Sequence, residues 1–373
     1  MTPEAPKIRD LTGGRIRLPI DLITSPVVDL LIAAWAREMD HEEQATYEVG
    51  VEWFDELAKR VPDDLVAEMG ELGGAWGTTW FGVMGLVAGA PEPDDPDSFF
   101  DWLADLDPTE LRLALISGKH GGPPTQVHRR AAGGDTAALE EALAEYVGKE
   151  EFTDAIRRLM LLDPRSLVSR VTAALRRFWW ECLAPMTEEW PAAQQRDAEM
   201  KRSQVGSTSP EGLIELATNG LDYRIPAGVT RLVLAPSVLL RPWSVIDDHG
   251  SMLIVIYGVA DEYLSADPDA PPGWMVKTYK ALGDERRLRI LRRLAEAEAS
   301  LDDLAEMLGL AKSTVHHHLG ILRGAGLVRV VIGRHGETSR YGARTGMTAE
   351  ASAALGSYLT TEAGATASGH ESA

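Results

Sequence analysis

The sequence predicts a mainly α-helical protein with α+β parts: a helical N-terminal body, a small β-rich middle segment, and a C-terminal module of helices and one hairpin. Apolar residues recur at helical spacing over most of the N-terminal half. Val, Leu and Ile gather between turn residues in 229–257, which is typical of a small sheet. At 373 residues the chain exceeds what one hydrophobic core usually organises, so we expect several domains.

The helical N-terminal body is expected to span residues 1–205. A short strand is predicted at 15–18, and Ser25-Pro26 then marks the start of a helix over 26–39. Helical patterns with short breaks follow, and the one over 78–90 is strongly apolar. A membrane span needs about twenty residues and this run has only about thirteen, so we interpret it as a buried helix and predict no membrane partner.

The middle segment is expected to span 206–272 and to pack with the N-terminal body. It follows a predicted helix over 165–183, and the Pro-rich residues 266–273 close it as a linker or sharp boundary. Its strand-like runs stand at 223–225, 232–235, 238–240 and 252–257.

Charge is distributed unevenly along the chain. The formal net charge is −20, but residues 274–344 contain 13 Lys and Arg against 8 Asp and Glu, which leaves −25 on the remainder. A basic module on an acidic body is expected when only one part of a protein meets phosphate. Cys182 is the only cysteine, which excludes an intramolecular disulfide and a multi-thiolate metal site. The first residues lack an apolar run like that of a signal peptide, so we expect a cytoplasmic protein.

Two capping patterns and a glycine divide the C-terminal module into helices. Asp284 is placed to cap one helix, and Ser300 with Asp303 forms a capping pattern before the next. Gly309 ends that helix before another, over 312–323. The predicted apolar face of the first helix consists of Leu288, Leu291 and Leu294.

A basic hairpin follows these helices. Strands are predicted at 327–332 and 337–341, around a tight turn at 333–336. Helix, helix, turn, helix and hairpin in this order form a winged helix-turn-helix, which inserts its last helix into the major groove of duplex DNA. We assign this fold to 273–345, and we expect a helix over 346–360 and a disordered tail over 361–373.

The helix over 312–323 can be oriented by its period of about 100° per residue. Val315, Leu319 and Leu322 fall on one side, and the opposite side is small and polar, which suits insertion into a groove. His318 lies at the edge of the buried side and is interpreted as structural. Adjacent positions diverge by about 100°, so the three histidines cannot converge on one ion, and we predict neither a metal nor a cofactor. The predicted DNA contacts are Lys312, Ser313, Thr314, His316, His317 and Arg323 on the helix, with Arg334, His335 and Arg340 in the hairpin.

Four sequence blocks stand in order within this module: KALGDERRLRIL at 280–291, LAEMLGL at 304–310, STVHHHL at 313–319 and LRGAGLV at 322–328. Together they resemble the ArsR/SmtB-type winged helix-turn-helix transcription regulators. The resemblance implies a homodimer that binds a palindromic operator, usually as a repressor. Metal-sensing members carry cysteines in the helix corresponding to 301–308, or His/Asp pairs in the C-terminal helix. This sequence has neither, so metal sensing is not implied.

A homodimer is also expected because one recognition helix reads few base pairs, and two-fold dimers reading two half-sites are the common solution. The predicted contacts are the helix around 275–282 and the apolar face of a helix over 348–359. That face consists of Ala351, Ala354, Leu355, Tyr358 and Leu359.

The N-terminal part is long for this family. Ser25-Pro26, Ala235-Pro236-Ser237 and Pro242-Trp243 resemble the N-terminal extension of some actinobacterial ArsR-like regulators. We find no Gly-x-Ser-x-Gly elbow, phosphate loop, His-Glu-x-x-His or dinucleotide fingerprint, so an enzyme fused to the winged helix is the least favoured hypothesis. The Trp76/Trp80 pair fits a pocket for a small apolar effector, although aromatic residues at helical spacing are more often core. A protein-interaction module remains the alternative to a small-molecule sensor.

Overall fold

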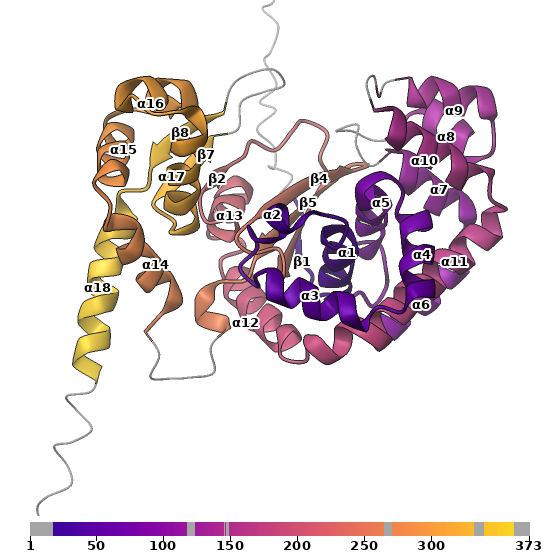
Figure 1. Ribbon diagram of the computed structural model, residues 1–373, viewed down its shortest axis with the longest axis horizontal. Helices are drawn as coiled ribbons and strands as arrows, with labels where there is room; N and C mark the ends of the chain where they lie inside the picture. Colours follow the sequence, from indigo (N-terminus) through magenta and orange to yellow (C-terminus); the bar gives the residue numbers. More distant parts are fainter. Residues whose placement is uncertain are drawn as a thin grey trace, which may run out of the picture.

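The computed structural model describes residues 18–117, 124–144, 146, 149–264, 271–331 and 339–361. Their fold is mainly helical, with strands in two four-stranded sheets of order β1-β3-β5-β4 and β2-β7-β8-β6. Figure 1 shows a large N-terminal part beside a smaller C-terminal part in orange and yellow. The predicted fold class, mainly α with α+β parts, is confirmed. Most of the strand predicted at 15–18, most of the Pro-rich linker, the tip of the hairpin and nearly all of the C-terminal tail lie outside the described residues.

The first sheet joins the two ends of the N-terminal part. β1 (Ile20–Leu22), β3 (Arg231–Ser237) and β5 (Met252–Gly258) run parallel, and β4 (Ser244–His249) pairs antiparallel with β5. Successive side chains of a strand point to opposite faces. One face of β3 and β5 therefore packs into the main helical core, and the other packs against α13 (Pro210–Ala217).

The main helical core covers one face of this sheet. α1 (Pro26–Ala36) is buried over nearly its whole length and lies against α5 (Thr78–Val87). The apolar run at 78–90 is thus a buried helix, as predicted, and Trp80 is fully buried in the core. The other helices of this part are α2 (His41–Gln44), α3 (Val51–Arg60), α4 (Asp63–Gly73), α6 (Pro96–Asp105), α7 (Pro108–Ser117), α8 (Gln126–Ala132), α9 (Thr136–Leu143), α10 (Glu150–Leu161), α11 (Pro164–Arg177) and α12 (Trp190–Ser203).

Several local predictions are wrong. Residues 238–240 are not a strand, because the chain leaves the sheet after Ser237. β4 was not predicted, because the edge strand SVIDDH is half-exposed and lacks the apolar enrichment of a central strand. The helix predicted over 165–183 changes into a π-helical turn, η2 (Phe178–Leu183), after α11. The strand predicted at 223–225 lies instead at Leu221–Asp222.

A buried carboxylate holds the segment after β3 against α1. Asp29, in the first turn of α1, accepts hydrogen bonds from the backbone N–H groups of Val238 at 3.3 Å and Leu239 at 3.1 Å. It also accepts from the Ser237 hydroxyl and, at 2.9 Å, from the Gln194 amide. Burial raises the pKa of Asp29 to about 6, although the hydrogen bonds from Ser237, Leu239 and Val238 act to lower it. Hydrogen bonds to the Asp29 carboxylate therefore connect α1 with α12 and with the end of β3.

The C-terminal part has its own hydrophobic core, formed between its helices and the second sheet. The two strands of the predicted hairpin are present, somewhat shorter than expected. Its elements are α14 (Gly273–Leu282), α15 (Glu285–Glu296), β6 (Ala299–Ser300), α16 (Leu301–Leu308), α17 (Lys312–Gly324), β7 (Val328–Val331), β8 (Arg340–Ala343) and α18 (Gly346–Thr361).

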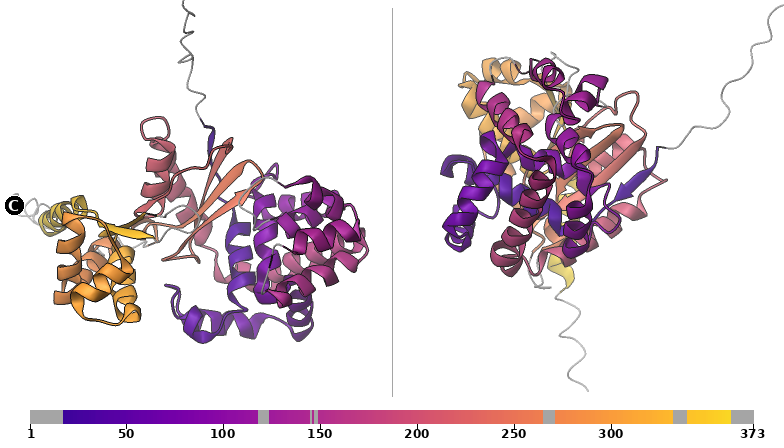
Figure 2. Two further views of the ribbon diagram at one scale, coloured as in Figure 1. Left: turned by 90° about the horizontal axis from the view of Figure 1, so that it is seen from above. Right: turned by 90° about the vertical axis from the view of Figure 1, so that its right-hand side faces the viewer.

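β2 (Leu221–Asp222), labelled in Figure 1, connects the large part to this second sheet. The left view of Figure 2 shows the C-terminal part, in orange and yellow, at one end of the molecule. β2 runs parallel to β7 with Leu221 opposite Val330, and the Val330 N–H donates to the carbonyl of Gly220 at 2.9 Å. Gly220 has a φ of 110°, and a Cβ there would lie 2.9 Å from the Arg344 side chain, so the position requires glycine. The segment predicted as 206–272 thus divides its strands between the two sheets.

Candidate nucleic-acid interface

Local capping interactions position the helices around α17. Asp284 accepts a hydrogen bond from the Arg287 N–H at 3.0 Å at the start of α15. Ser300 and Asp303 form a reciprocal capping box at the start of α16, as the sequence pattern predicts. Gly309 then adopts the left-handed conformation with a φ of 64°, which ends α16 and turns the chain into α17.

α17 presents one buried and one exposed face. Val315, Leu319 and Leu322 are at most 2% exposed and belong to the C-terminal core. Ser313, His316, His317 and Gly320 are exposed on the other side. The orientation predicted from the helical period is therefore confirmed. Ala311 stands at the N-cap without a side-chain acceptor, so the first turn is held by backbone hydrogen bonds alone.

Two of the predicted DNA-contacting cations, Lys312 and Arg340, are exposed and take part in few interactions with the described residues. The ammonium of Lys312 lies 2.8 Å from Asp302, and both side chains are 65% exposed. A solvent-exposed pair of this kind contributes at most about 1 kcal/mol, so it competes weakly with a phosphate. Arg340 is exposed on β8 and donates to the carbonyl oxygen of Glu298 at 2.7 Å. Thr314 is half-buried beside them.

The remaining predicted contacts differ in their placement. Arg323, in the last turn of α17, is half-buried and lines two cavities shared with the large part of the protein. Burial lowers the pKa of its guanidinium, opposed by Tyr341. Arg334 and His335 lie outside the described residues, so their contact with DNA stays a prediction.

His318 packs inward, as the sequence interpretation proposed. It is 7% exposed, and burial lowers the pKa of its imidazole below the ordinary value, against the opposing charge of Asp284. Neither ring nitrogen has a hydrogen-bond partner among the described residues. Across all described residues, no group of three or more His, Cys, Asp or Glu side chains is placed to hold a metal ion.

The first helix of the module carries a basic surface that the sequence reasoning did not assign. Arg286, Arg289 and Arg292 are exposed on α15 at a spacing of three, which places them along one side of the helix. Leu288, predicted as part of the apolar face, is 47% exposed. The other two predicted residues do face the core: Leu294 is buried, and Leu291, partly buried, packs against the core. Ile290, which lies four residues before Leu294 on the same side of the helix, is also buried.

Known proteins resemble part of this chain. The family described as bacterial regulatory protein, arsR family, matches residues 284–330. The HTH-type transcriptional regulator KmtR of Mycobacterium tuberculosis is 37% identical over 71 residues, which are 18% of this chain and 55% of KmtR. The match thus spans about half the length of that relative. The solved structure of reduced HlyU from Vibrio cholerae is 30% identical with a TM-score of 0.19, covering 25% of this chain and 90% of HlyU.

None of the helices in the described ranges is long and apolar enough to cross a membrane. The matched residues contain α15, α16, α17 and most of β7, with the caps and turns described above. Residues 284–330 therefore form a helix-turn-helix domain of the ArsR family.

Proposed function

We propose that this chain is a cytoplasmic, non-enzymatic DNA-binding transcription regulator that acts as a homodimeric repressor on a palindromic operator. One observation carries the proposal: α17 of the ArsR-family domain exposes Ser313, His316 and His317 on a single face that the other described residues leave uncovered. Hydroxyl and imidazole groups can donate to and accept from base edges, and the major groove is wide enough to admit a helix.

Basic side chains beside this face supply the contacts to phosphate. Lys312 at the start of α17 and Arg340 on β8 are exposed, and among the described residues they are held by one exposed ion pair and one carbonyl. Arg334 and His335 in the hairpin extend the same role to the wing. Phosphate contacts fix the register of a protein on DNA, and base contacts select the sequence.

The homodimer is proposed to form along α14 and α18. These helices pack on each other within one chain, where the Tyr279 hydroxyl donates to the carbonyl of Ala351 at 3.3 Å. Ala351 is thereby buried, whereas Tyr279 is 38% exposed and Leu359 is 66% exposed. A second copy would cover these apolar side chains. Sedimentation at micromolar concentration tests this, and a monomer both with and without DNA would remove the dimer.

The N-terminal part is proposed to supply the signal by sensing a small molecule. It is attached to the DNA-binding module by strand pairing and by ion pairs. A conformational change in the N-terminal part would therefore alter the position of the module. Mass spectrometry of the purified native protein separates the candidates. A co-purified small molecule supports sensing, whereas a stable complex with another protein favours an interaction module.

Selection of bound sequences from a random duplex library tests DNA recognition. The wild-type protein should enrich a palindrome, and a variant carrying His316→Ala and His317→Ala should lose preference at the matching positions. Loss of a good base contact costs about 1–3 kcal/mol, which is about 5- to 150-fold in discrimination. His41→Ala is the matched control, since His41 is 72% exposed on α2 of the large part. Unchanged preference in the double variant would contradict the assignment of α17.

A further inference from the structure

A cavity of about 370 Å³ lies between the large part of the protein and the winged helix module. Its walls come from both sides: α13 and the segments around Arg241 and Asp261 on one, and α14, α17 and α18 on the other. The volume falls within the range of about 300–1,000 Å³ found for small-molecule sites. A ligand held here would touch the DNA-reading helix and the N-terminal part at the same time.

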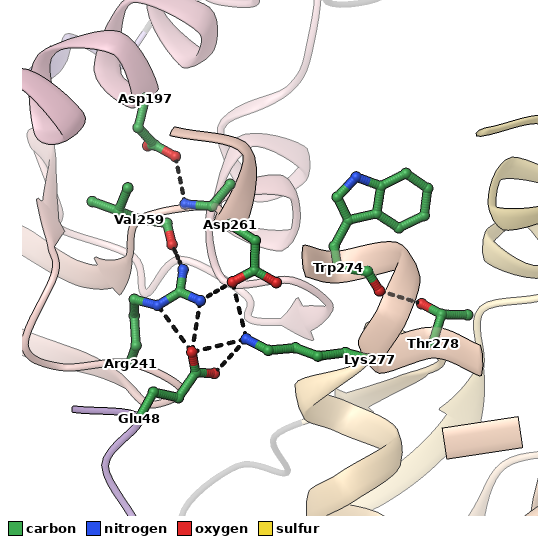
Figure 3. A network of polar contacts seen from close by, with 9 residues as sticks. Glu48, Asp197, Arg241, Val259, Asp261, Trp274, Lys277 and Thr278 are labelled. Carbon is green, nitrogen blue, oxygen red and sulfur yellow. Dashed lines mark hydrogen bonds and ion pairs between the residues drawn. The ribbon is translucent and has the colours of Figure 1, made fainter. Parts of the chain in front are cut away.

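One end of the cavity is formed by a network of ion pairs whose charges are already matched. Figure 3 shows Arg241 between Glu48 and Asp261, with Lys277 reaching both carboxylates from α14. The Lys277 ammonium lies 2.8 Å from Glu48 and 2.9 Å from Asp261, and Arg241 lies 2.6 Å from Glu48 and also contacts Asp261. Burial of Glu48 opposes ionisation, but Arg241 and Lys277 outweigh it and hold the pKa of Glu48 below its ordinary value. Two cations and two carboxylates thus satisfy one another.

Arg323 differs from these cations because, within the part of the chain that the structure describes, no counter-ion contacts it. It lines the cavity from the last turn of α17, and among the described residues no carboxylate or carbonyl accepts a hydrogen bond from its guanidinium. The neighbouring Arg344 donates to Asn219 at 2.8 Å and to the carbonyl of Gly326 at 3.2 Å. A half-buried cation without a partner carries a desolvation cost that a bound anion would offset.

Apolar side chains face the same space. Leu216 of α13 is 39% exposed, and Trp274 of α14 and Met347 of α18 are half-buried where they line the cavity. Charged side chains, among them Glu262 and Glu350, line other parts of the cavity, so the apolar side chains form only one part of its wall. Small-molecule sites combine an apolar surface with polar groups that fix the orientation of the ligand. The guanidinium of Arg323 matches a carboxylate through two parallel N–H···O bonds.

We propose that this cavity binds a small amphiphilic carboxylate, with the acid group on Arg323 and the apolar portion against Trp274, Leu216 and Met347. The assignment gives Arg323 a partner other than the DNA phosphate that the sequence predicts for it. Resting on the proposed function, it also identifies the route of regulation: the ligand contacts α14, α17 and α18 together with the large part, and so favours one arrangement of the two.

Calorimetry on the full-length protein without DNA tests the site. The probes are phenylacetate and octanoate at up to millimolar concentration, each compared with its neutral counterpart, 2-phenylethanol or octan-1-ol. At least one acid should bind, and its alcohol should bind at least about tenfold more weakly, because a hydrogen-bonded ion pair is lost. If neither acid binds, or if acid and alcohol bind equally, the proposal is wrong.

Two substitutions localise the binding. Arg323→Gln should weaken the acid at least about tenfold and leave the alcohol unchanged, whereas Arg323→Lys should restore part of the affinity because it keeps the charge. Arg292→Gln is the matched control, since Arg292 is 87% exposed on α15. Circular dichroism verifies that each variant is folded. Equal affinity of wild type and Arg323→Gln would overturn the assignment.

Operator binding, measured separately with and without the acid, distinguishes the two proposals. Binding of the acid is measured on protein without DNA, so its result does not depend on whether the protein binds DNA. A protein that binds the acid but no duplex refutes the regulator and leaves the site. A protein that binds its operator but neither acid refutes the site and leaves the regulator.

Discussion

Asp29 should make the stability of this protein depend on pH in a direction opposite to that of a surface carboxylate. Burial raises its pKa from 3.8 to about 6 in the folded protein. The folded chain therefore binds this proton more tightly than the unfolded chain does. The carboxyl is protonated in both states below about pH 4 and ionised in both above about pH 6, so its contribution to the free energy of unfolding falls as the pH rises between them. A shift of about two units corresponds to about 3 kcal/mol.

Replacing Asp29 by Asn removes this titration while it keeps the size of the side chain. Urea unfolding of both proteins from about pH 4 to about pH 7 measures the effect, because every other carboxyl titrates in both and cancels in the difference. The stability of the wild type relative to Asp29→Asn should fall by about 3 kcal/mol over this range. Asp55→Asn is the control, since Asp55 is 49% exposed. A difference that stays constant within about 0.5 kcal/mol would refute the reasoning.

Three other sites give measurable outcomes. Arg334→Ala should lower the slope of log K against log salt by about one in fluorescence anisotropy with operator DNA, and an unchanged slope would argue against a wing on the DNA. Gly220→Val places a β-branched residue at a φ of 110° against Arg344, which should cost about 1–3 kcal/mol and speed hydrogen exchange of the Val330 amide. Slow, unchanged exchange would contradict the pairing of β2 with β7. Asp261→Asn removes a carboxylate from the network of Figure 3 and should cost about 1.5–3 kcal/mol in urea unfolding, less at high salt; no change would show that the network contributes nothing.

The C-terminal helices could be predicted closely because their signals are local. The cap at Asp284, the capping box of Ser300 and Asp303, and the glycine at 309 each act within one or two turns of the chain. The buried and exposed faces of α17 follow from the helical period, and a helix of thirteen residues is long enough to reveal that period. Leu288 shows the limit of this reasoning, since it has the same spacing as Leu291 and Leu294, which face the core, and is nevertheless 47% exposed.

The rest depends on contacts between residues far apart in sequence. β1 pairs with β3, placing Ile20 beside Leu232, and no local pattern indicates which strand a three-residue segment will join. The partners of Asp29 lie 165 to 210 residues away, so its carboxylate could be classified only as a first-turn acid. Helical geometry places Arg323 on a flank of α17, but it cannot show that Arg323 also lines a cavity shared with the large part of the protein.

The strand pairing at β2 and the ion pairs of Lys277 restrict how the winged helix module can move. A rigid object held at one point keeps three rotations, but one held at two points keeps only the rotation about the line that joins them. One point is the β2–β7 pair with Arg344 on Asn219, and the other is Lys277 on Glu48 and Asp261. If both attachments hold, any swing of α17 relative to the large part would be confined to a single axis, and in a homodimer that axis would set how the distance between the two recognition helices changes.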